Sequence, residues 1–204
     1  MVHSTYMKNL SKIVMGACAF TAGSLFAENN ASSWNPYVEV KGAVGKVETF
    51  HIPQLGDMKF KKGFGGAVEA GLSYQNWRIG LEFAYFKTKA KSIDGFPFQN
   101  GVSYKIDNLS GMLCVYHDFA INNSFDIYAG AGVGLSRTKA KYNNPIIPVK
   151  ISGHTTHFTW QVMTGLAYHI NENWSTKVGY RFFKIQSKDY SDVHMLELGL
   201  RYNF

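Results

Sequence analysis

The amino-acid sequence predicts an all-β fold: an eight-stranded antiparallel up-and-down transmembrane β-barrel preceded by a cleavable signal peptide. Three observations lead to this prediction. Apolar and polar residues alternate with a period of two, long connections alternate with short ones, and the chain is rich in aromatic residues (15 %) and glycine (20 residues). Aromatic side chains form the interfacial girdles of such barrels, and glycine fits where backbones and side chains approach closely.

Eight segments have the alternation of a strand with one apolar face. From Trp77 to Tyr85 every second residue is apolar, and the pattern recurs, with Thr176 as the exception, from Trp174 to Phe182 and from Leu196 to Phe204. The segments are long enough for a tilted transmembrane strand, which needs about 9–11 residues. The expected strands are 36–46, 63–74, 77–85, 102–117, 125–136, 158–169, 174–182 and 196–204.

The connections between these strands alternate strictly in length. Long ones are expected at 47–62, 88–101, 137–157 and 184–191, and short ones at 75–76, 118–124 and 171–173. In an up-and-down barrel this alternation places every long connection at one end. Bacterial outer-membrane barrels have this asymmetry, with long loops outside the cell and short turns in the periplasm. The sequence therefore predicts extracellular long loops and periplasmic N- and C-termini.

The N-terminus has the features of a secretory signal, which predicts a signal peptide at 1–27 and a barrel domain at 28–204. Lys8 and Lys12 precede an apolar, small-residue run that ends at Ala27. Met7 is a second candidate for the true start. A lipoprotein anchored through Cys18 is an alternative, but Met15-Gly16-Ala17 is a poor match to a lipoprotein signal. Cleavage after Ala27 leaves one cysteine, Cys114, and so no intramolecular disulfide.

Two other classes of protein fit the sequence less well. No mature segment has the ~20 apolar residues of a transmembrane helix. A soluble ligand-carrying barrel would alternate with its apolar face inward, but here the polar face is mostly Gly, Ala and Ser, too small for a solvated exterior. The chain also ends on the membrane-facing parity, and aromatic residues flank the short turns as a girdle would: Tyr74 and Trp77, Phe119 and Phe125, Tyr168 and Trp174.

Several motifs resemble the small outer-membrane β-barrel domain family of opacity-type and OmpA-type surface antigens. They are Phe125 to Gly134 (FDIYAGAGVG), Trp160-Gln161 through Gly165, Trp174, Gly179-Tyr180-Arg181 and the closing LGLRYNF from Leu198. The last motif is similar to the C-terminal signal read by the barrel-insertion machinery, carried here by Leu198, Leu200, Tyr202 and Phe204. Ile127 departs from the pattern, since many relatives have proline there. The resemblance implies a fold and a location but no single activity.

The predicted strands separate the charges of the mature chain into three groups. The long-loop side carries six acidic and fourteen basic residues, a net of +8, while the periplasmic side carries only acids, Glu28, Asp118, Asp126 and Glu172. The inward face carries nine charges, expected to pair across a lumen barely wide enough for side chains. They are Glu39, Lys41, Glu69, Arg78, Glu82, Lys177, Arg181, Glu197 and Arg201. A gated ion path is the alternative to this plug.

The sequence gives little support for an enzyme or a metal site. Small outer-membrane lipid hydrolases use a nucleophile with a histidine near the membrane surface, and no His and Ser lie close together on one strand face here. His154 and His157, three residues apart in an expected loop, have no third ligand in view. We therefore expect no catalytic residue, metal or cofactor, and we keep an outer-membrane hydrolase as the remote alternative.

The function predicted from the sequence is that of a monomeric surface protein, structural or adhesin-like. Its partners are expected to be outer-membrane lipid and lipopolysaccharide, the barrel-insertion machinery, and host surface glycans or proteins. Despite a sequence pI of about 9.3, nucleic acid is not expected, because the basic residues belong to secreted loops. Lys139, Lys141 and Lys150 in the longest expected loop are the predicted contacts to polyanions.

Overall fold

A computed structural model of the protein describes residues 34–204, except 53–55, 94–95, 98–102, 145–148 and 188–191. The predicted signal peptide at 1–27 lies outside the described residues. Within the described part, no helix has the length and apolarity that crossing a membrane requires, a finding that does not bear on strands.

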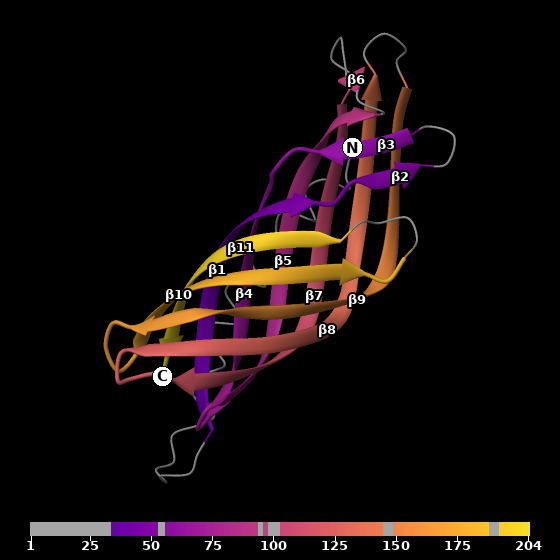
Figure 1. Ribbon diagram of the computed structural model, residues 1–204. Coiled ribbons are helices and arrows are strands. Elements are labelled where there is room, and N and C mark those ends of the chain that lie inside the picture. Colours follow the sequence, from indigo (N-terminus) through magenta and orange to yellow (C-terminus); the bar gives the residue numbers. More distant parts are fainter. Residues whose placement is uncertain (1–33, 53–55, 94–95, 98–102, 145–148, 188–191) are drawn as a thin grey trace.

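Eight long antiparallel strands close into a barrel in which each pairs with the next along the chain and the last pairs with the first (Figure 1). Closure is made by β1, in which Glu39 lies opposite both Glu69 of β4 and Arg201 of β11. The predicted eight-stranded antiparallel up-and-down barrel is therefore confirmed. The barrel strands are β1 (Asn35–Val47), β4 (Gly63–Tyr74), β5 (Trp77–Ile93), β7 (Ser103–Ala120), β8 (Phe125–Asn144), β9 (Val149–His169), β10 (Trp174–Ile185) and β11 (Val193–Asn203).

Three short strands lie outside the barrel wall, at its long-connection end. They are β2 (Phe50–Ile52), β3 (Gly56–Phe60) and β6 (Phe96–Pro97). β3 pairs with β5 and with β2, while β6 pairs with the end of β5. The expected loop at 47–62 thus contains two strands.

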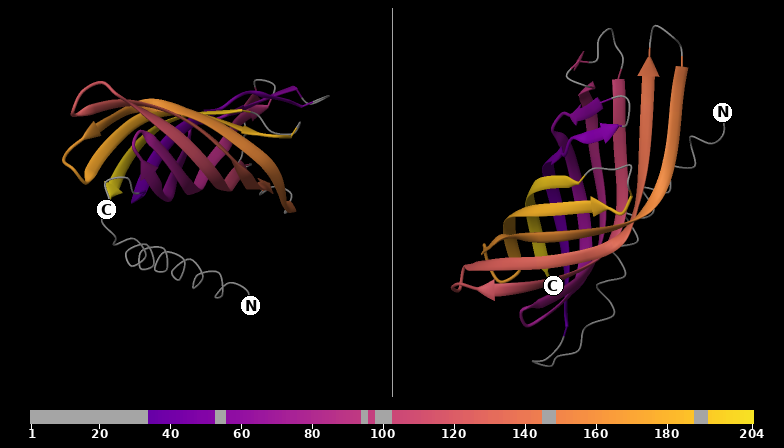
Figure 2. Two further views of the ribbon diagram at one scale, coloured as in Figure 1. Left: turned by 90° about the horizontal axis from the view of Figure 1, so that it is seen from below. Right: turned by 45° about the vertical axis from the view of Figure 1, so that its right-hand side comes forward.

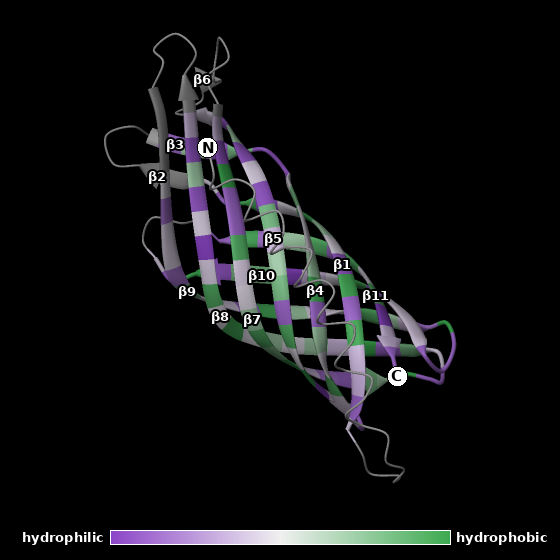
Figure 3. Ribbon diagram, turned by 180° about the vertical axis from the view of Figure 1, so that it is seen from behind, coloured by the Kyte–Doolittle hydropathy of each residue, from purple (hydrophilic) through white to green (hydrophobic). Residues whose placement is uncertain are grey.

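Hydrophobic and hydrophilic residues alternate along the strands (Figure 3), and the large apolar side chains are mostly the exposed ones. Phe64 and Phe83 are 69 % and 64 % exposed, whereas the carboxylates of Glu69 and Glu82 on the other face are fully buried. Exposed apolar side chains around a polar interior are the reverse of a soluble barrel and match a wall in contact with lipid.

The barrel is much taller on one side than on the other (Figure 2). β7, β8 and β9 have 18, 20 and 21 residues, while β10 and β11 have 12 and 11. The expected strand ends at 85, 136 and 158 are therefore wrong, and most of 88–101 and 137–157 is strand. The alternation continues there between polar residues, with Ser136 and Thr138 buried and Arg137 and Lys139 exposed, so hydropathy gives no signal.

The tall side ends in an extended hairpin of β8 and β9. Their pairing continues to Asn144 opposite Val149, but the pairing of β9 with β10 stops at Thr159 opposite Ile185. One further backbone bond joins Gln186 N–H to the Phe158 carbonyl, over 2.9 Å. Above Phe158, β9 therefore has a described strand partner on one side only.

The other end of the barrel carries the three short turns and both ends of the described chain. Aromatic rings meet there across neighbouring strands, with centroids 5.0 Å apart for Phe125 and Tyr168 and 4.9 Å apart for Trp174 and Tyr202. The backbone N–H of Phe204 donates to the Pro36 carbonyl. This ring of aromatic residues has the place of an interfacial girdle.

A closed barrel resists SDS until it is heated, because each of its strands is hydrogen-bonded to a neighbour on both sides through the barrel wall. We expect the folded protein in detergent to migrate differently on a denaturing gel before and after boiling. Equal migration of the two samples, together with a helical circular dichroism spectrum, would contradict the fold.

Candidate functional sites: the lumenal charge network and the basic outer face

An ion pair spans the full width of the lumen. Arg181 of β10 donates from Nη1 and Nη2 to the two carboxylate oxygens of Glu82 of β5, over 2.5 and 2.6 Å. These strands are four neighbours apart in either direction around the eight-stranded ring. The fork geometry joins opposite walls with both charges removed from water.

Three glutamates stand side by side in one row of the sheet. Glu39, Glu69 and Glu82 are register partners on β1, β4 and β5. Like charges directly opposite each other on neighbouring strands are destabilising. The ammonium of Lys41 offsets this repulsion, since it lies 2.5 Å from Glu69, 2.7 Å from Glu82 and 3.9 Å from Glu39.

Two tyrosines complete the coordination of the central carboxylate. The hydroxyls of Tyr37 and Tyr116 donate to the two oxygens of Glu69 over 2.5 and 2.7 Å. The Tyr116 hydroxyl also accepts from Lys41 over 3.2 Å. Glu69 is therefore bonded at both oxygens although its side chain is fully buried.

The remaining charges extend the network to β10 and β11. Lys177 pairs with Glu39, and Nε of Arg181 lies 2.8 Å from a carboxylate oxygen of Glu197. Arg201 is held more weakly, 3.4 Å from the Ser175 hydroxyl and 3.6 Å from the Asp118 carboxylate. All nine predicted interior charges thus lie inside the barrel, in contact with one another or with a polar neighbour.

Asp118 corrects the expected division of charges. The sequence places it in a periplasmic turn, but β7 continues to Ala120, and its carboxylate accepts two bonds from Arg78, from Nε over 2.6 Å and Nη2 over 2.7 Å. Asp118 raises the acids of this network from four to five, equal to its five bases, while Asp126, whose side chain is equally buried, pairs separately with His169. Neutrality is what a low-dielectric interior requires of its charges.

Uncharged members of the network were not predicted. Gln161 of β9 accepts from Arg181 over 2.9 Å and donates to Glu82 over 3.2 Å, so it supports the central pair from a third strand. The Arg78 guanidinium lies 4.4 Å from the centre of the Tyr116 ring. The sequence does contain a signal for these uncharged residues. Gln161, Tyr37 and Tyr116 lie on the inward parity of their strands, on the same face as buried or charged residues.

Glycines make room for the aromatic rings of the lumen. A Cβ on Gly130 of β8 would collide with the Tyr116 ring, and one on Gly179 of β10 with the Tyr128 hydroxyl. Both positions face inward, and tyrosine rings take the space of the absent side chains, Tyr116 from the neighbouring strand β7 and Tyr128 from β8, two strands from Gly179. The abundance of glycine therefore has a packing reason as well as a backbone one.

The network separates two cavities of different character. A polar cavity of about 310 Å³ at the short-turn end is lined by Arg78, Asp118, Asp126 and His169 among others, and Asp126 and His169 are 2.6 Å apart. An apolar cavity of about 130 Å³ lies on the other side. Lys41, Glu69, Glu82 and Arg181, which belong to the network between them, are at most 6 % exposed.

Strand geometry argues against a metal site at His154 and His157. These residues lie in β9, not in a loop, and a spacing of three sends their side chains to opposite faces of the strand. Among the described residues, no group of three or more His, Cys, Asp and Glu is placed to hold a metal ion.

One serine and one histidine do lie opposite each other, Ser136 of β8 and His157 of β9. The Ser136 hydroxyl is fully buried and accepts from Thr159 over 2.7 Å. It therefore offers no accessible nucleophile.

Basic side chains cover the outer face of the tall wall. On the outward parity of β5, β7 and β8, Lys89, Lys105 and Lys141 are direct register partners in one row. A second row holds Lys87, Asp107 and Lys139, and below it Arg137 stands beside Leu109. We call these six basic residues the basic face: Lys87, Lys89, Lys105, Arg137, Lys139 and Lys141.

The predicted polyanion contacts lie in strands rather than in a loop. Lys139 and Lys141 belong to β8 and are exposed, and Lys150 is the second residue of β9. Lys141 pairs with the carboxylate of Asp107 over 3.1 Å, and Tyr85 donates to the other oxygen of Asp107 over 3.1 Å. The prediction of a loop at 137–157 is wrong, because both faces of β8 and β9 are polar there and hydropathy does not distinguish such a strand from a loop.

The architecture defines a transmembrane β-barrel: a closed, lipid-facing wall with a plugged polar interior. A family model described as the outer membrane protein beta-barrel domain matches residues 15–204, and the chain belongs to this family. Its membership indicates the bacterial outer membrane as its location. Among curated proteins, none matches the chain.

Solved structures share the fold at low sequence identity. Neisserial surface protein A (NspA) is 21 % identical, with a TM-score of 0.57, over 83 % of this chain and 97 % of that one. Ail of Yersinia pestis, solved with the heparin analogue sucrose octasulfate, is 16 % identical with a TM-score of 0.57, covering 84 % and 99 %. OprG of Pseudomonas aeruginosa is 13 % identical with a TM-score of 0.56, covering 85 % and 97 %.

Removing one partner of a buried pair leaves an uncompensated charge. We expect Arg181→Ala to lower the free energy of unfolding by about 3–5 kcal/mol, and Arg201→Ala, whose contacts are longer, by clearly less. Arg137→Ala on the exposed outer face is the matched control, with an expected change of about 0.5 kcal/mol or less. Urea unfolding in lipid vesicles measures all three; equal losses for Arg181 and Arg137 would show that the central pair is solvated.

The buried layer also predicts poor conduction. In planar bilayers we expect the unmutated protein to give small channels or none, because paired charges fill the lumen between the two cavities. Regular openings at every voltage would contradict a filled interior and favour the ion-path alternative.

Proposed function

We propose that this protein is a surface-interaction protein, structural or adhesin-like, whose basic face and neighbouring lysines bind anionic groups. The observation that carries the proposal is the row of Lys89, Lys105 and Lys141 on three adjacent strands. Directly opposed like charges destabilise a sheet. Within the described residues, Asp107 is the one acid in the two rows, and an anion bound over them would relieve the repulsion.

The position of the basic face supports lipopolysaccharide as the first source of these anions. The same outward parity is apolar just below, at Phe83, Leu109 and Leu135, and turns basic at Lys87 and Arg137. In a barrel with its long connections outside the cell, this step falls where the phosphates of the outer leaflet lie. Sulfated glycans of another cell carry the same chemistry, and the complex of Ail with a heparin analogue is a precedent in a protein of the same fold.

Several features of the proposal rest on the sequence. The signal peptide at 1–27, the periplasmic termini and the reading of Leu198, Leu200, Tyr202 and Phe204 by the insertion machinery belong to it. Leu198 and Leu200 are exposed on the outer face of β11, and Phe204, which follows the strand, is exposed as well. We propose a monomer with no enzymatic activity and no nucleic-acid partner. The buried Ser136 and the filled lumen support this reading over a hydrolase or a pore.

Binding to heparin tests the proposal in its general form. The folded protein should bind heparin at low salt, and the affinity should fall steeply as salt rises, because exposed charges are screened. Neutralising Lys139, Lys141 and Lys150 to glutamine should weaken binding about tenfold, or about 1.4 kcal/mol, while the temperature of unfolding stays unchanged.

A control removes charges outside the two rows. Lys46 of β1 is exposed, and the Lys184 side chain of β10 is 41 % exposed. Their double change to glutamine should leave most of the affinity, whereas the double change of Lys139 and Lys141 should weaken it. Equal weakening by both doubles would show that net charge alone acts. A second arm with lipopolysaccharide bilayers distinguishes the sources: stabilisation of the barrel there without heparin binding would leave only the anchoring role.

A further inference from the structure

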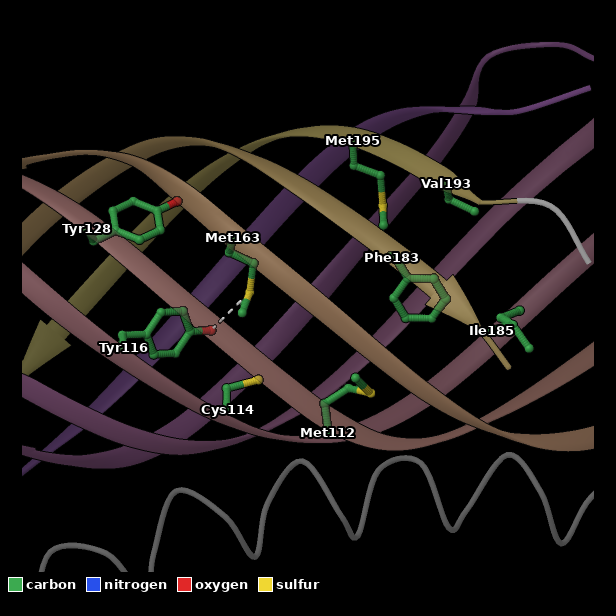
Figure 4. Close-up of a cluster of buried hydrophobic side chains, with 9 residues drawn as sticks. All are labelled: Met112, Cys114, Tyr116, Tyr128, Met163, Phe183, Ile185, Val193 and Met195. Carbon is green, nitrogen blue, oxygen red and sulfur yellow. Dashed lines mark hydrogen bonds between the residues drawn. The ribbon is translucent and has the colours of Figure 1, made fainter. Parts of the chain in front are cut away.

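The apolar cavity is not explained by a role in binding anions. It lies in the lumen beyond the charge network, toward the long connections, with a volume of about 130 Å³. Its apolar walls come mainly from β1, β10 and β11, and Figure 4 shows Phe183, Ile185, Val193 and Met195 grouped together, apart from Tyr116 and Tyr128. Phe86 of β5 and Met58 of β3 complete this side.

The opposite wall is polar but uncharged. It carries hydroxyl and amide side chains of β5, β7 and β8, including Thr88, Asn108 and Thr138. These groups already have protein partners: Thr88 donates to the Lys61 carbonyl, and the Asn108 amide donates to the Thr138 hydroxyl, each over 2.9 Å. The wall therefore tolerates a single hydroxyl on a ligand without requiring one.

The charges at the floor are neutralised within the protein. Arg181 and Glu197 line the cavity, but Arg181 forms its two-pronged pair with Glu82 and a third contact with Glu197. A charged ligand would lose its hydration here without gaining an unpaired counter-charge. The cavity thus selects against ions and in favour of neutral molecules.

We propose that this cavity is a binding site for a small, uncharged, apolar molecule about the size of one aromatic ring. Its volume is close to that of an engineered apolar cavity of about 150 Å³ that stays dry and binds benzene. Water is a poor occupant of the apolar side, because a buried water needs two to four polar partners. The surrounding strands, held by hydrogen bonds on both sides, keep the walls from collapsing into the space.

Benzyl alcohol is a suitable probe, since it is neutral, water-soluble and has one ring. The protein folded in nanodiscs, with methionine methyl groups labelled with carbon-13, supplies the reporters. Met58 and Met195 line the cavity, whereas Met163 does not and lies against the Tyr116 hydroxyl at 3.6 Å. We expect saturable shifts of the Met58 and Met195 methyl signals, little change at Met163, and no saturable shift with benzoate, which has the same ring and a charge.

A pair of variants one residue apart tests the site itself. Ala43 faces the cavity, and Val44 faces outward on the same strand. Ala43→Phe should fill the space and weaken binding at least about tenfold, while Val44→Phe should leave it unchanged. Binding retained in Ala43→Phe, equal shifts at Met163, or saturable binding of benzoate would overturn the proposal. If Ala43→Phe does not fold, as heat-dependent migration will show, the comparison of benzyl alcohol with benzoate decides alone.

Discussion

The ammonium of Lys41, placed among three aligned glutamates, is the interaction on which the interior depends. Glu39, Glu69 and Glu82 face the lumen from adjacent strands in a single row. Without a cation between them, pairing β1 with β4 and β4 with β5 would press like charges together. Lys41 contacts all three, while Arg181 and Lys177 of β10 bring further positive charge. Pairing these three strands in this register therefore depends on cations in the lumen.

The charge network also divides the protein into regions of different polarity. In the middle of the lumen, the polar and charged side chains of the network bind one another and are therefore not available to a ligand. What remains is an apolar space on one side of the layer, a polar space on the other, and the outer surface of the tall wall. Because the network fills the middle of the lumen, ligands can bind only at the ends of the barrel or on its outer surface.

Most of the barrel follows from a period of two, since alternation gives the strands, their faces and hence the nine interior charges. The same signal fails where both faces are polar, which is why β8 was predicted to end at 136 and not at Asn144. Alternation along one strand also does not predict which residues of different strands lie side by side. That Asp118 meets Arg78, or that Lys89, Lys105 and Lys141 share a row, depends on register between strands, which no single strand encodes.

The open side of β9 limits how deep the protein sits in a bilayer. Above Phe158, the described part of β9 has no strand partner on the side of β10. A strand edge of this kind does not persist in hydrocarbon, which offers backbone N–H and C=O groups no hydrogen-bond partner. The apolar slab must therefore end near Phe158 on this side of the barrel. The end of the β9–β10 pairing thus marks the depth of the bilayer surface. The outward side chains of β9 change from phenylalanine to threonine and histidine at the same level.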